Sequence, residues 1–250
     1  MRRLAIAVLL GLQVASTGCG GNDGRTLKVG AASSLKLPLA KLAATYPAGT
    51  LVLESGGSDK LAAAIRAGRR PDVFIAASRA QPDSLYADRL AGRPVAVAGN
   101  SLVIATRKGG PKFRSLADLG RRGVRIALGS KTVPIGAYAD KALAKLPAQQ
   151  RTAILNNVKS REPDASSVTA KLREGAVDAA LLYRTDVDGS TGTLSAVAIP
   201  KSVAPLVTYF AAVVNGTKLP IASAALVKSL RSGRGQSLLR SAGFLPPPAK

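Results

Sequence analysis

The sequence predicts an α/β fold in two lobes, each a mainly parallel sheet with helices on both faces. Short apolar runs rich in Val, Ile and Leu alternate with segments whose apolar residues recur at three- and four-residue spacing. The chain has 250 residues, 46% of them hydrophobic, which is enough for one large domain or two modest lobes with proper cores. At two places we expect the chain to pass from one lobe to the other.

The clearest strands and helices follow one another along the chain. The first strand ends on small residues at Ala31 and passes two serines to a helix that we expect from about Leu35. The expected strands cover residues 27–31, 50–54, 72–77, 102–106, 124–128, 179–183 and 208–214, and expected helices cover residues 60–68, 138–146 and 167–175.

The expected crossings between the lobes are the strand at residues 100–106 and the return at residues 200–210. Lobe 1 then comprises residues 26–103 and 204–250, and lobe 2 comprises residues 104–203. Ligands of α/β folds sit beyond the carboxyl ends of strands, where helices begin. We therefore expect the binding site in the cleft between the lobes.

The N-terminal segment has the layout of an export signal. Arg2 and Arg3 precede an apolar run at residues 4–12 that is followed by small residues, which predicts a signal peptide over residues 1–18. The run is too short to span a bilayer as a mature helix. Cys19 follows in "STGCGG", which resembles the lipobox of bacterial lipoproteins, although Ser16 departs from the more usual leucine. A free cysteine beside an ordinary cleavage site is the alternative.

An acylated Cys19 would anchor the protein to the cell membrane on its extracytoplasmic side, because each buried methylene of a lipid contributes about 0.8 kcal/mol. The glycine-rich residues 19–25 would then act as a flexible tether. Cys19 is the only cysteine, so we expect no disulfide.

The charge of the chain is strongly basic, with a formal net charge of +22 that becomes +20 when Arg2 and Arg3 leave with the signal. Such an excess attracts anionic lipid, cell-wall polymers or nucleic acid. Against nucleic acid, the Lys and Arg residues are scattered, aromatic residues are only 4%, and the export signal places the protein outside the cytoplasm. We therefore expect no nucleic-acid partner, and we interpret the charge as a property of the surface.

The residue inventory argues against an enzyme. The chain has no histidine, which excludes a Ser-His-Asp arrangement and the usual zinc and copper ligand sets. Its 14 acidic residues form no motif for carboxylate chemistry, and "GSKT" at residues 129–132 lacks the spacing of a phosphate loop. We expect no catalytic residue, no cofactor and no metal site.

Four hydroxyl-rich or small-residue turns open helices. They are "SS" at residues 33–34, "SGGS" at 55–58, "VPIG" at 133–136 and "PDASS" at 163–167. Each exposes unpaired backbone N–H groups at the positive end of a helix dipole, which binds anions without a cationic side chain. N-capping alone explains any one of them. Four in a chain without catalytic residues favour convergence on an anion.

Several blocks of the sequence resemble one family, the extracytoplasmic molybdate-binding proteins of ABC transporters, in the type 2 superfamily of periplasmic binding proteins. The resemblance runs from about residue 27 to 244. It is carried by "VGAASSL", "SGGSDKLAAAIRAGRRPDVFIAAS", "GNSLVIATRKG", "TVPIGAYADKALAKL" and "REGAVDAALLYRTDV".

The resemblance implies a tetrahedral oxyanion held by neutral groups in the interlobe cleft. The family's anion-binding positions match Ser34, Ser58 and Tyr183, which would bind through their hydroxyls. They also match Ile135 and Ala165, which would bind through their backbone N–H groups. Molybdate is then the ligand, with tungstate as a near-isostere, and the only metal is the one inside the oxyanion. The resemblance also implies delivery to an ABC permease, and we expect a monomer.

Departures from the family pattern leave alternatives open. Asp59 stands where a small or neutral residue is more frequent, and a carboxylate turned into the cleft would weaken binding or change the ligand. Ser78 and Ala165 are smaller departures, and Ser33 replaces Ser34 if the turn is shifted by one. The alternatives are therefore a binder of sulfate, phosphate or another oxyanion, and a surface lipoprotein that has lost transport.

Overall fold

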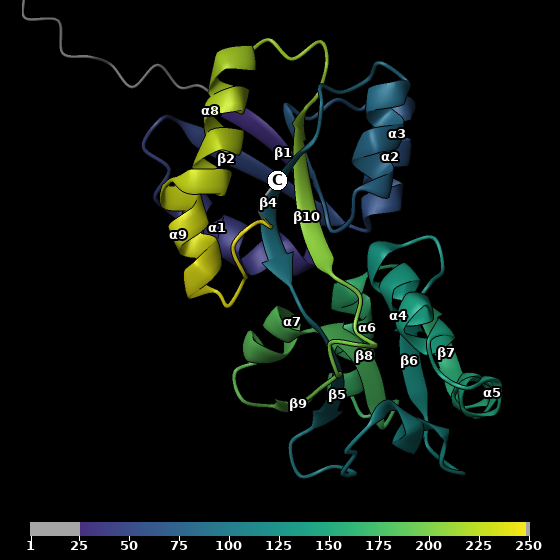
Figure 1. Ribbon diagram of the computed structural model, residues 1–250. Coiled ribbons are helices and arrows are strands. Elements are labelled where there is room, and N and C mark those ends of the chain that lie inside the picture. The colour runs from purple at the N-terminus through teal and green to yellow at the C-terminus, as the bar shows by residue number, and fades with distance from the viewer. Residues whose placement is uncertain (1–25, 249–250) are drawn as a thin grey trace, which may run out of the picture.

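The computed structural model describes residues 26–248, which form two five-stranded sheets in two lobes (Figure 1). The expected signal peptide at residues 1–18 and the tether at residues 19–25, with Cys19, lie outside the described residues, as do residues 249–250. No helix within residues 26–248 is long and apolar enough to cross a membrane.

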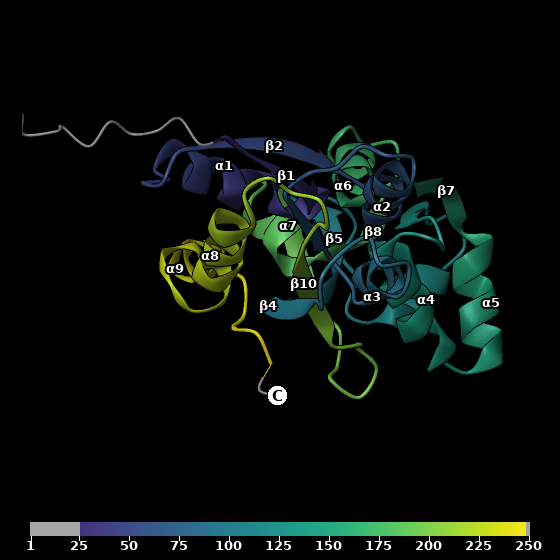
Figure 2. The ribbon, with the colours of Figure 1, turned by 90° about the horizontal axis from the view of Figure 1, so that it is seen from above.

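The first sheet has the strand order β2-β1-β3-β10-β4. Its helices lie on both sides, with α8 and α9 on one side and α2 and α3 on the other (Figures 1 and 2). The strands are β1 (Thr26–Ala32), β2 (Thr50–Gly56), β3 (Val73–Ala76), β4 (Val95–Asn100) and β10 (Val207–Val213), and the helices are α1 (Lys36–Ala44), α2 (Ser58–Arg66), α3 (Ala80–Ala87), α8 (Pro220–Ser232) and α9 (Arg234–Ser241).

The second sheet has the strand order β7-β6-β8-β5-β9. In Figure 1, α7 lies on one side of it and α4 and α5 lie on the other. The strands are β5 (Leu102–Arg107), β6 (Ile126–Gly129), β7 (Val158–Glu162), β8 (Ala179–Tyr183) and β9 (Leu194–Ala198), and the helices are α4 (Pro134–Ala144), α5 (Ala148–Asn156), α6 (Ala165–Arg173) and α7 (Arg184–Asp188).

The chain passes between the sheets twice. It leaves the first sheet at Asn100, the last residue of β4, and enters the second sheet at Leu102, the first residue of β5. It returns between β9 and β10. The prediction of a two-lobed α/β fold with two crossings is confirmed.

The expectation of mainly parallel sheets needs correction, because half of the strand pairs are antiparallel. β1 pairs in parallel with β2 and β3, and β6 pairs in parallel with β7 and β8. β10 is antiparallel to β3 and β4, and β5 is antiparallel to β8 and β9. The strands β5 and β10 are the ones that enter a sheet from the other lobe, and apolar composition carries no information on that direction.

Every expected strand and helix overlaps an observed one, and three strands were missed. β7 has the sequence "VKSRE" and β9 has "LSAVA", and both lie at sheet edges where polar residues interrupt the apolar run. β4, "VAVAGN", is also an edge strand, and small residues weaken its strand pattern.

The core of the first lobe begins on β1, where Leu27, Val29 and Ala31 are each 1% exposed. Their alternation with more exposed residues ends at the carboxyl end of the strand, and Leu35 in the following 3-10 turn is also 1% exposed. Burial of each Leu or Val side chain contributes about 1.5–3 kcal/mol. This packing holds the serine turn at a defined position beside the cleft.

Candidate anion-binding site

A small cavity lies between the lobes. The five residues singled out by the family resemblance all line it, as does the alternative, Ser33. The lining residues are Ala32, Ser33, Ser34, Gly56, Gly57, Ser58, Ala77, Val133, Pro134, Ile135, Asp164, Ala165 and Tyr183. Folding therefore brings distant stretches of the sequence to one place, and their binding role stays a prediction.

The cavity is built from strand ends in both sheets. β1 and β2 end at Ala32 and Gly56, immediately before the serine turns, and β8 ends at Tyr183. β6 and β7 end shortly before the first turns of α4 and α6. Because the carboxyl ends of parallel strands meet at one edge of a sheet, both sheets present their helix openings to the same cleft.

The serine hydroxyls are held by backbone donors. The Oγ of Ser58 accepts a hydrogen bond from the backbone N–H of Ala77 at 3.3 Å, and the Oγ of Ser33 accepts one from the N–H of Ser166 at 3.2 Å. Each hydroxyl therefore uses its oxygen within the protein and keeps its proton for another acceptor. Ser58 is 1% exposed and lines the cavity, so its proton is available to an acceptor placed there.

Tyr183 offers a further neutral donor. Its side chain is 1% exposed, and its hydroxyl has no hydrogen-bond partner within residues 26–248. Burial raises the pKa of Tyr183 well above its ordinary value, and the nearby Tyr209, Tyr138 and Asp186 raise that pKa further. The hydroxyl keeps its proton, and an unpaired buried group of this kind costs about 1–3 kcal/mol. An acceptor in the cavity would remove that cost.

The backbone supplies donors from two helices. Ile135 and Ala165 belong to the first turns of α4 and α6, where an α-helix provides no carbonyl acceptor for the N–H groups. Both residues line the cavity and are 2% and 5% exposed. The positive ends of the two helix dipoles therefore add to the field of the hydroxyl donors.

The cavity is almost free of formal charge despite the basic surface of the protein. Its lining residues include one carboxylate, Asp164, and no Lys or Arg. Asp164 is the N-cap of α6, and its Oδ1 accepts a hydrogen bond from the N–H of Ser167 at 2.8 Å. Electrostatic attraction in the cavity thus comes from donors and dipoles.

Hydrogen bonds join the two lobes across the cleft. Thr132 donates from Oγ1 to Oδ2 of Asp59 at 2.9 Å, and Gln81 donates from Nε2 to the carbonyl oxygen of Thr132 at 3.4 Å. A Cβ atom on Gly57 would lie 2.6 Å from the carbonyl oxygen of Pro163. The lobes are therefore in close contact. Asp59, which raised the concern of a carboxylate in the cleft, binds Thr132 and is not among the residues that line the cavity.

Asp186 is an acidic group whose importance sequence reasoning missed. Its Oδ2 is buried and has no hydrogen-bond partner among the described residues, while the side chain as a whole is half-buried. Burial raises the pKa of Asp186 to about 7, a hydrogen bond from the backbone of Tyr183 lowers it, and the charge of Asp164 raises it. Asp186 lines a neighbouring hollow together with Ser33 and Ser34. An aspartate in the first turn of a short helix carries no sequence signal of such burial.

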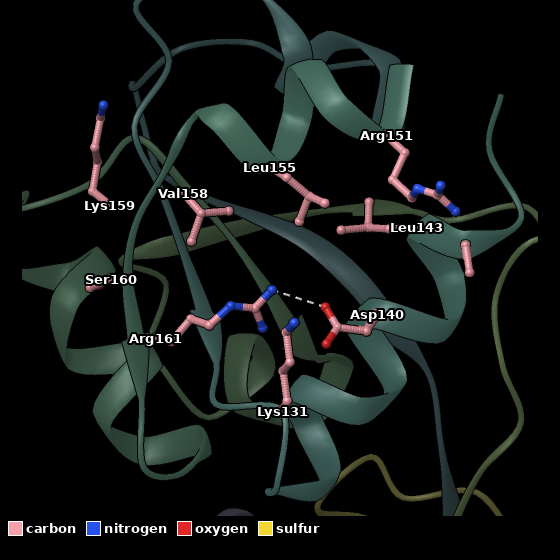
Figure 3. Close-up of a pocket in the computed structure, with 10 residues that line it drawn as sticks. Lys131, Asp140, Leu143, Arg151, Leu155, Val158, Lys159, Ser160 and Arg161 are labelled. Carbon is pink, nitrogen blue, oxygen red and sulfur yellow. Dashed lines mark hydrogen bonds and ion pairs between the residues drawn. The ribbon is translucent and has the colours of Figure 1, made fainter. Parts of the chain in front are cut away.

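A different hollow opens on the second lobe beside α4, α5 and β7 (Figure 3). In Figure 3, Arg161 and Asp140 point toward each other, and Nη2 of Arg161 lies 3.0 Å from Oδ1 of Asp140. Lys131, Arg151 and Lys159 also line this hollow. It shares no lining residue with the interlobe cavity, and its cations belong to the basic surface of the protein.

Comparison with known proteins gives one family and several relatives. The family described as bacterial extracellular solute-binding protein matches residues 27–245. The molybdate-binding protein ModA of Mycobacterium tuberculosis and that of Mycobacterium bovis are each 31% identical over 240 residues, covering 93% of this chain and 90% of the relative.

Solved structures share the fold. The periplasmic molybdate-binding protein of Azotobacter vinelandii has a TM-score of 0.78 at 19% identity, covering 89% of this chain and 100% of that one. The sulfate-binding protein SubI of Mycobacterium tuberculosis has a TM-score of 0.77 at 17% identity, covering 88% of this chain and 86% of that one. The family match over nearly the whole described chain, with the identity to the mycobacterial relatives, shows that the protein is a solute-binding protein and not an enzyme, a member of the bacterial extracellular solute-binding protein family.

Proposed function

We propose that the protein binds molybdate in the interlobe cavity, accepts tungstate as a near-isostere, and delivers the anion to an ABC permease. One observation carries the proposal: the cavity gathers hydroxyl and backbone donors from both lobes and contains no cationic side chain. The 31% identity to the mycobacterial molybdate-binding proteins supports molybdate as the first ligand to test.

The donor set suits an oxyanion that carries no proton. Hydrogen bonds to a charged group contribute about 1.5–3 kcal/mol each, which is more than neutral pairs contribute. Donors from Ser34, Ser58 and Tyr183, with the N–H groups of Ile135 and Ala165, would surround a tetrahedral anion and replace its hydration shell. All of these residues come from one chain, so the proposed binding needs no second copy.

Closure of the lobes would let the permease distinguish the protein with bound anion from the empty protein. Donors lie on both sides of the cleft, and the contacts of Asp59 with Thr132 and of Ser33 with Ser166 form only when the lobes meet. A ligand that contacts both lobes stabilises the closed form over the open one. Hinged closure would thus bury the anion and present a combined surface to the transporter.

The test is a thermal-shift screen of the protein with molybdate, tungstate, sulfate and phosphate. Molybdate at 100 times its dissociation constant should stabilise the folded protein by about 2.7 kcal/mol, which raises the midpoint temperature of unfolding clearly.

Ser58→Ala and Tyr183→Phe should each weaken molybdate binding by about ten-fold or more in titration calorimetry, since each removes one donor to a charged ligand. Tyr183→Phe should also stabilise the empty protein, because it removes an unpaired buried hydroxyl.

The matched control is Ser84→Ala, because the Oγ of Ser84 accepts a hydrogen bond from Nη2 of Arg66 at 2.6 Å and does not line the cavity. It should leave molybdate affinity unchanged. A shift with sulfate or phosphate and none with molybdate or tungstate would assign the cavity to another oxyanion. Wild-type affinity in both Ser58→Ala and Tyr183→Phe would place the site elsewhere.

We also propose that Cys19 carries a lipid that holds the protein on the extracytoplasmic face of the cell membrane, as the sequence motif indicates. Cys19→Ser should then move the protein from the membrane fraction to the soluble extracytoplasmic fraction, because the anchor depends on that thiol. Quantitative immunoblotting of the two fractions measures this. A mutant that stays in the membranes would show that an uncleaved signal or the basic surface holds it.

A further inference from the structure

Two buried polar side chains outside the cavity are linked to one of its serines. Tyr209, the third residue of β10, is 0% exposed, and its hydroxyl lies 2.8 Å from the Oγ of Ser34. Asn100, at the end of β4, is 3% exposed, and its Nδ2 lies 3.4 Å from the hydroxyl of Tyr209. Neither Tyr209 nor Asn100 is among the residues that line the cavity.

A contact with the backbone fixes which atom donates in each of these hydrogen bonds. The Oδ1 of Asn100 accepts a hydrogen bond from the backbone N–H of Ser101 at 2.8 Å. Since an N–H can only donate, the side-chain atom facing it has to be the oxygen, and the other end of the amide is the NH₂ group. This group donates to Oγ1 of Thr185 at 2.9 Å and to the hydroxyl of Tyr209.

The hydroxyl of Tyr209 therefore accepts from Asn100 and has one proton to give. Burial raises the pKa of Tyr209 well above its ordinary value, and the charge of Asp186 raises it further. The phenol stays protonated, and the Oγ of Ser34 is the acceptor beside it. The hydroxyl proton of Ser34 is then left for the cavity that Ser34 lines.

We infer that Asn100 and Tyr209 are positioning residues that hold the hydroxyl of Ser34 with its proton directed into the cavity. The inference rests on the proposed binding of an oxyanion there and deepens it. Ser58 has the same arrangement through the N–H of Ala77. The difference is that Ser34 depends on two side chains, from β4 and β10, so its donor role is set by residues that do not line the cavity.

Because Asn100 donates to Tyr209 and Tyr209 donates to Ser34, the hydroxyl of Ser34 acts toward the cavity as a donor and not as an acceptor. A free serine hydroxyl donates or accepts according to its partner, whereas an oxygen already occupied by Tyr209 favours donation to the cavity. Such a site favours an anion without protons, such as molybdate, over phosphate, which still carries a proton at neutral pH. Loss of the Tyr209 hydroxyl frees Ser34 to turn and accept that proton.

The experiment is a double-mutant cycle read by titration calorimetry with molybdate. Tyr209→Phe keeps the ring that packs against Tyr183 and Phe244 and removes only the hydroxyl. Removal of one neutral hydrogen bond should weaken molybdate binding by about two- to twelve-fold. In a background that already carries Ser34→Ala, Tyr209→Phe should weaken binding by less than about two-fold, because the group it acts through is gone.

Two further arms separate positioning from general packing. The ratio of phosphate affinity to molybdate affinity should rise in Tyr209→Phe and stay at the wild-type value in Tyr138→Phe, a control that removes a buried hydroxyl facing the backbone N–H of Thr208. Asn100→Asp turns the donor into an acceptor, so Tyr209 should donate to the new carboxylate and Ser34 to Tyr209. Molybdate affinity should then fall further than in Tyr209→Phe.

The outcomes are distinguishable. Wild-type protein that binds neither molybdate nor tungstate overturns the proposed function, and wild-type protein that binds neither sulfate nor phosphate either overturns the inference with it. Wild-type protein that binds molybdate while Tyr209→Phe and Ser34→Ala have additive effects overturns the inference alone. An unchanged phosphate-to-molybdate ratio in Tyr209→Phe also overturns it.

Discussion

Replacement of Asp186 by asparagine should make the protein more stable at pH 8, by up to about 4 kcal/mol, and should flatten the pH dependence of its stability. Burial holds the pKa of Asp186 at about 7 in the folded protein, against 3.8 for an ordinary aspartate. Between pH 3.8 and pH 7, Asp186 therefore keeps its proton in the folded state and has lost it in the unfolded state. Stability falls as pH rises through this window, and the loss is complete above pH 7.

Asp186→Asn removes this loss because an amide cannot ionise. The figure is an upper bound, since the side chain is half-buried and keeps some contact with solvent. Urea unfolding of both proteins at several pH values between 5 and 8 measures the difference, which should grow with pH. The effect also concerns the site, because a neutral Asp186 near Ser33 and Ser34 does not repel an anion in the cleft.

Asp188→Asn is the matched control, on the same short helix. Asp188 is exposed and forms an ion pair with Arg184 at 2.8 Å. Exposed pairs contribute about 0–1 kcal/mol, so this variant should change stability little. Stability curves for wild type and Asp186→Asn that run parallel from pH 5 to 8 would contradict the buried-acid assignment.

Gly136→Ala should destabilise the protein by about 3 kcal/mol or more, at the upper end of overpacking effects. Gly136 lies in the first turn of α4, and a Cβ there would overlap the backbone carbonyl oxygens of Ser130 and Gly129. Backbone cannot move aside as a flexible side chain does, so α4 has to shift away from the end of β6. The shift would also displace the N–H of Ile135, so molybdate binding should weaken as well.

Helix propensity predicts the opposite sign, since alanine is favoured over glycine in a helix by about 0.5–1 kcal/mol. Gly56→Ala provides the control, because a Cβ at Gly56 has no neighbour within 4 Å among the described residues. It should change stability by no more than about 0.5 kcal/mol. Urea unfolding checks both, and a Gly136→Ala protein as stable as wild type would mean that the turn before α4 yields easily.

The strands in the interior of the sheets were predictable from the sequence, because a continuous run of apolar residues indicates a strand that is buried on both faces. "DVFIAA" and "AALLY" correspond to β3 and β8, whose residues are buried throughout. The edge strands β7 and β9 lack that signal, since both are partly exposed and most residues of β7 are polar. Strand direction was not predictable for β5 and β10, because it depends on the lobe from which the chain arrives.

The candidate site was predictable in part. Serine turns before helices and the "VPIG" and "PDASS" openings carry local signals, and the structure brings them around one cavity. Asn100, Tyr209 and Asp186 carried no such signal. Each is a polar residue in or beside an apolar strand, and its importance comes from partners far away in sequence, such as Ser34 for Tyr209.

By itself, the sequence determined the α/β class, the division into two lobes and the absence of histidine chemistry, because hydrophobic periodicity and residue inventory are local properties of a chain. Only the tertiary structure decided that Asp59 binds Thr132 instead of entering the cleft, and that the hydroxyl of Tyr209 faces Ser34. Those outcomes depend on distances between residues from different elements. Such distances are fixed when both sheets pack their helices and the two crossings set one lobe against the other.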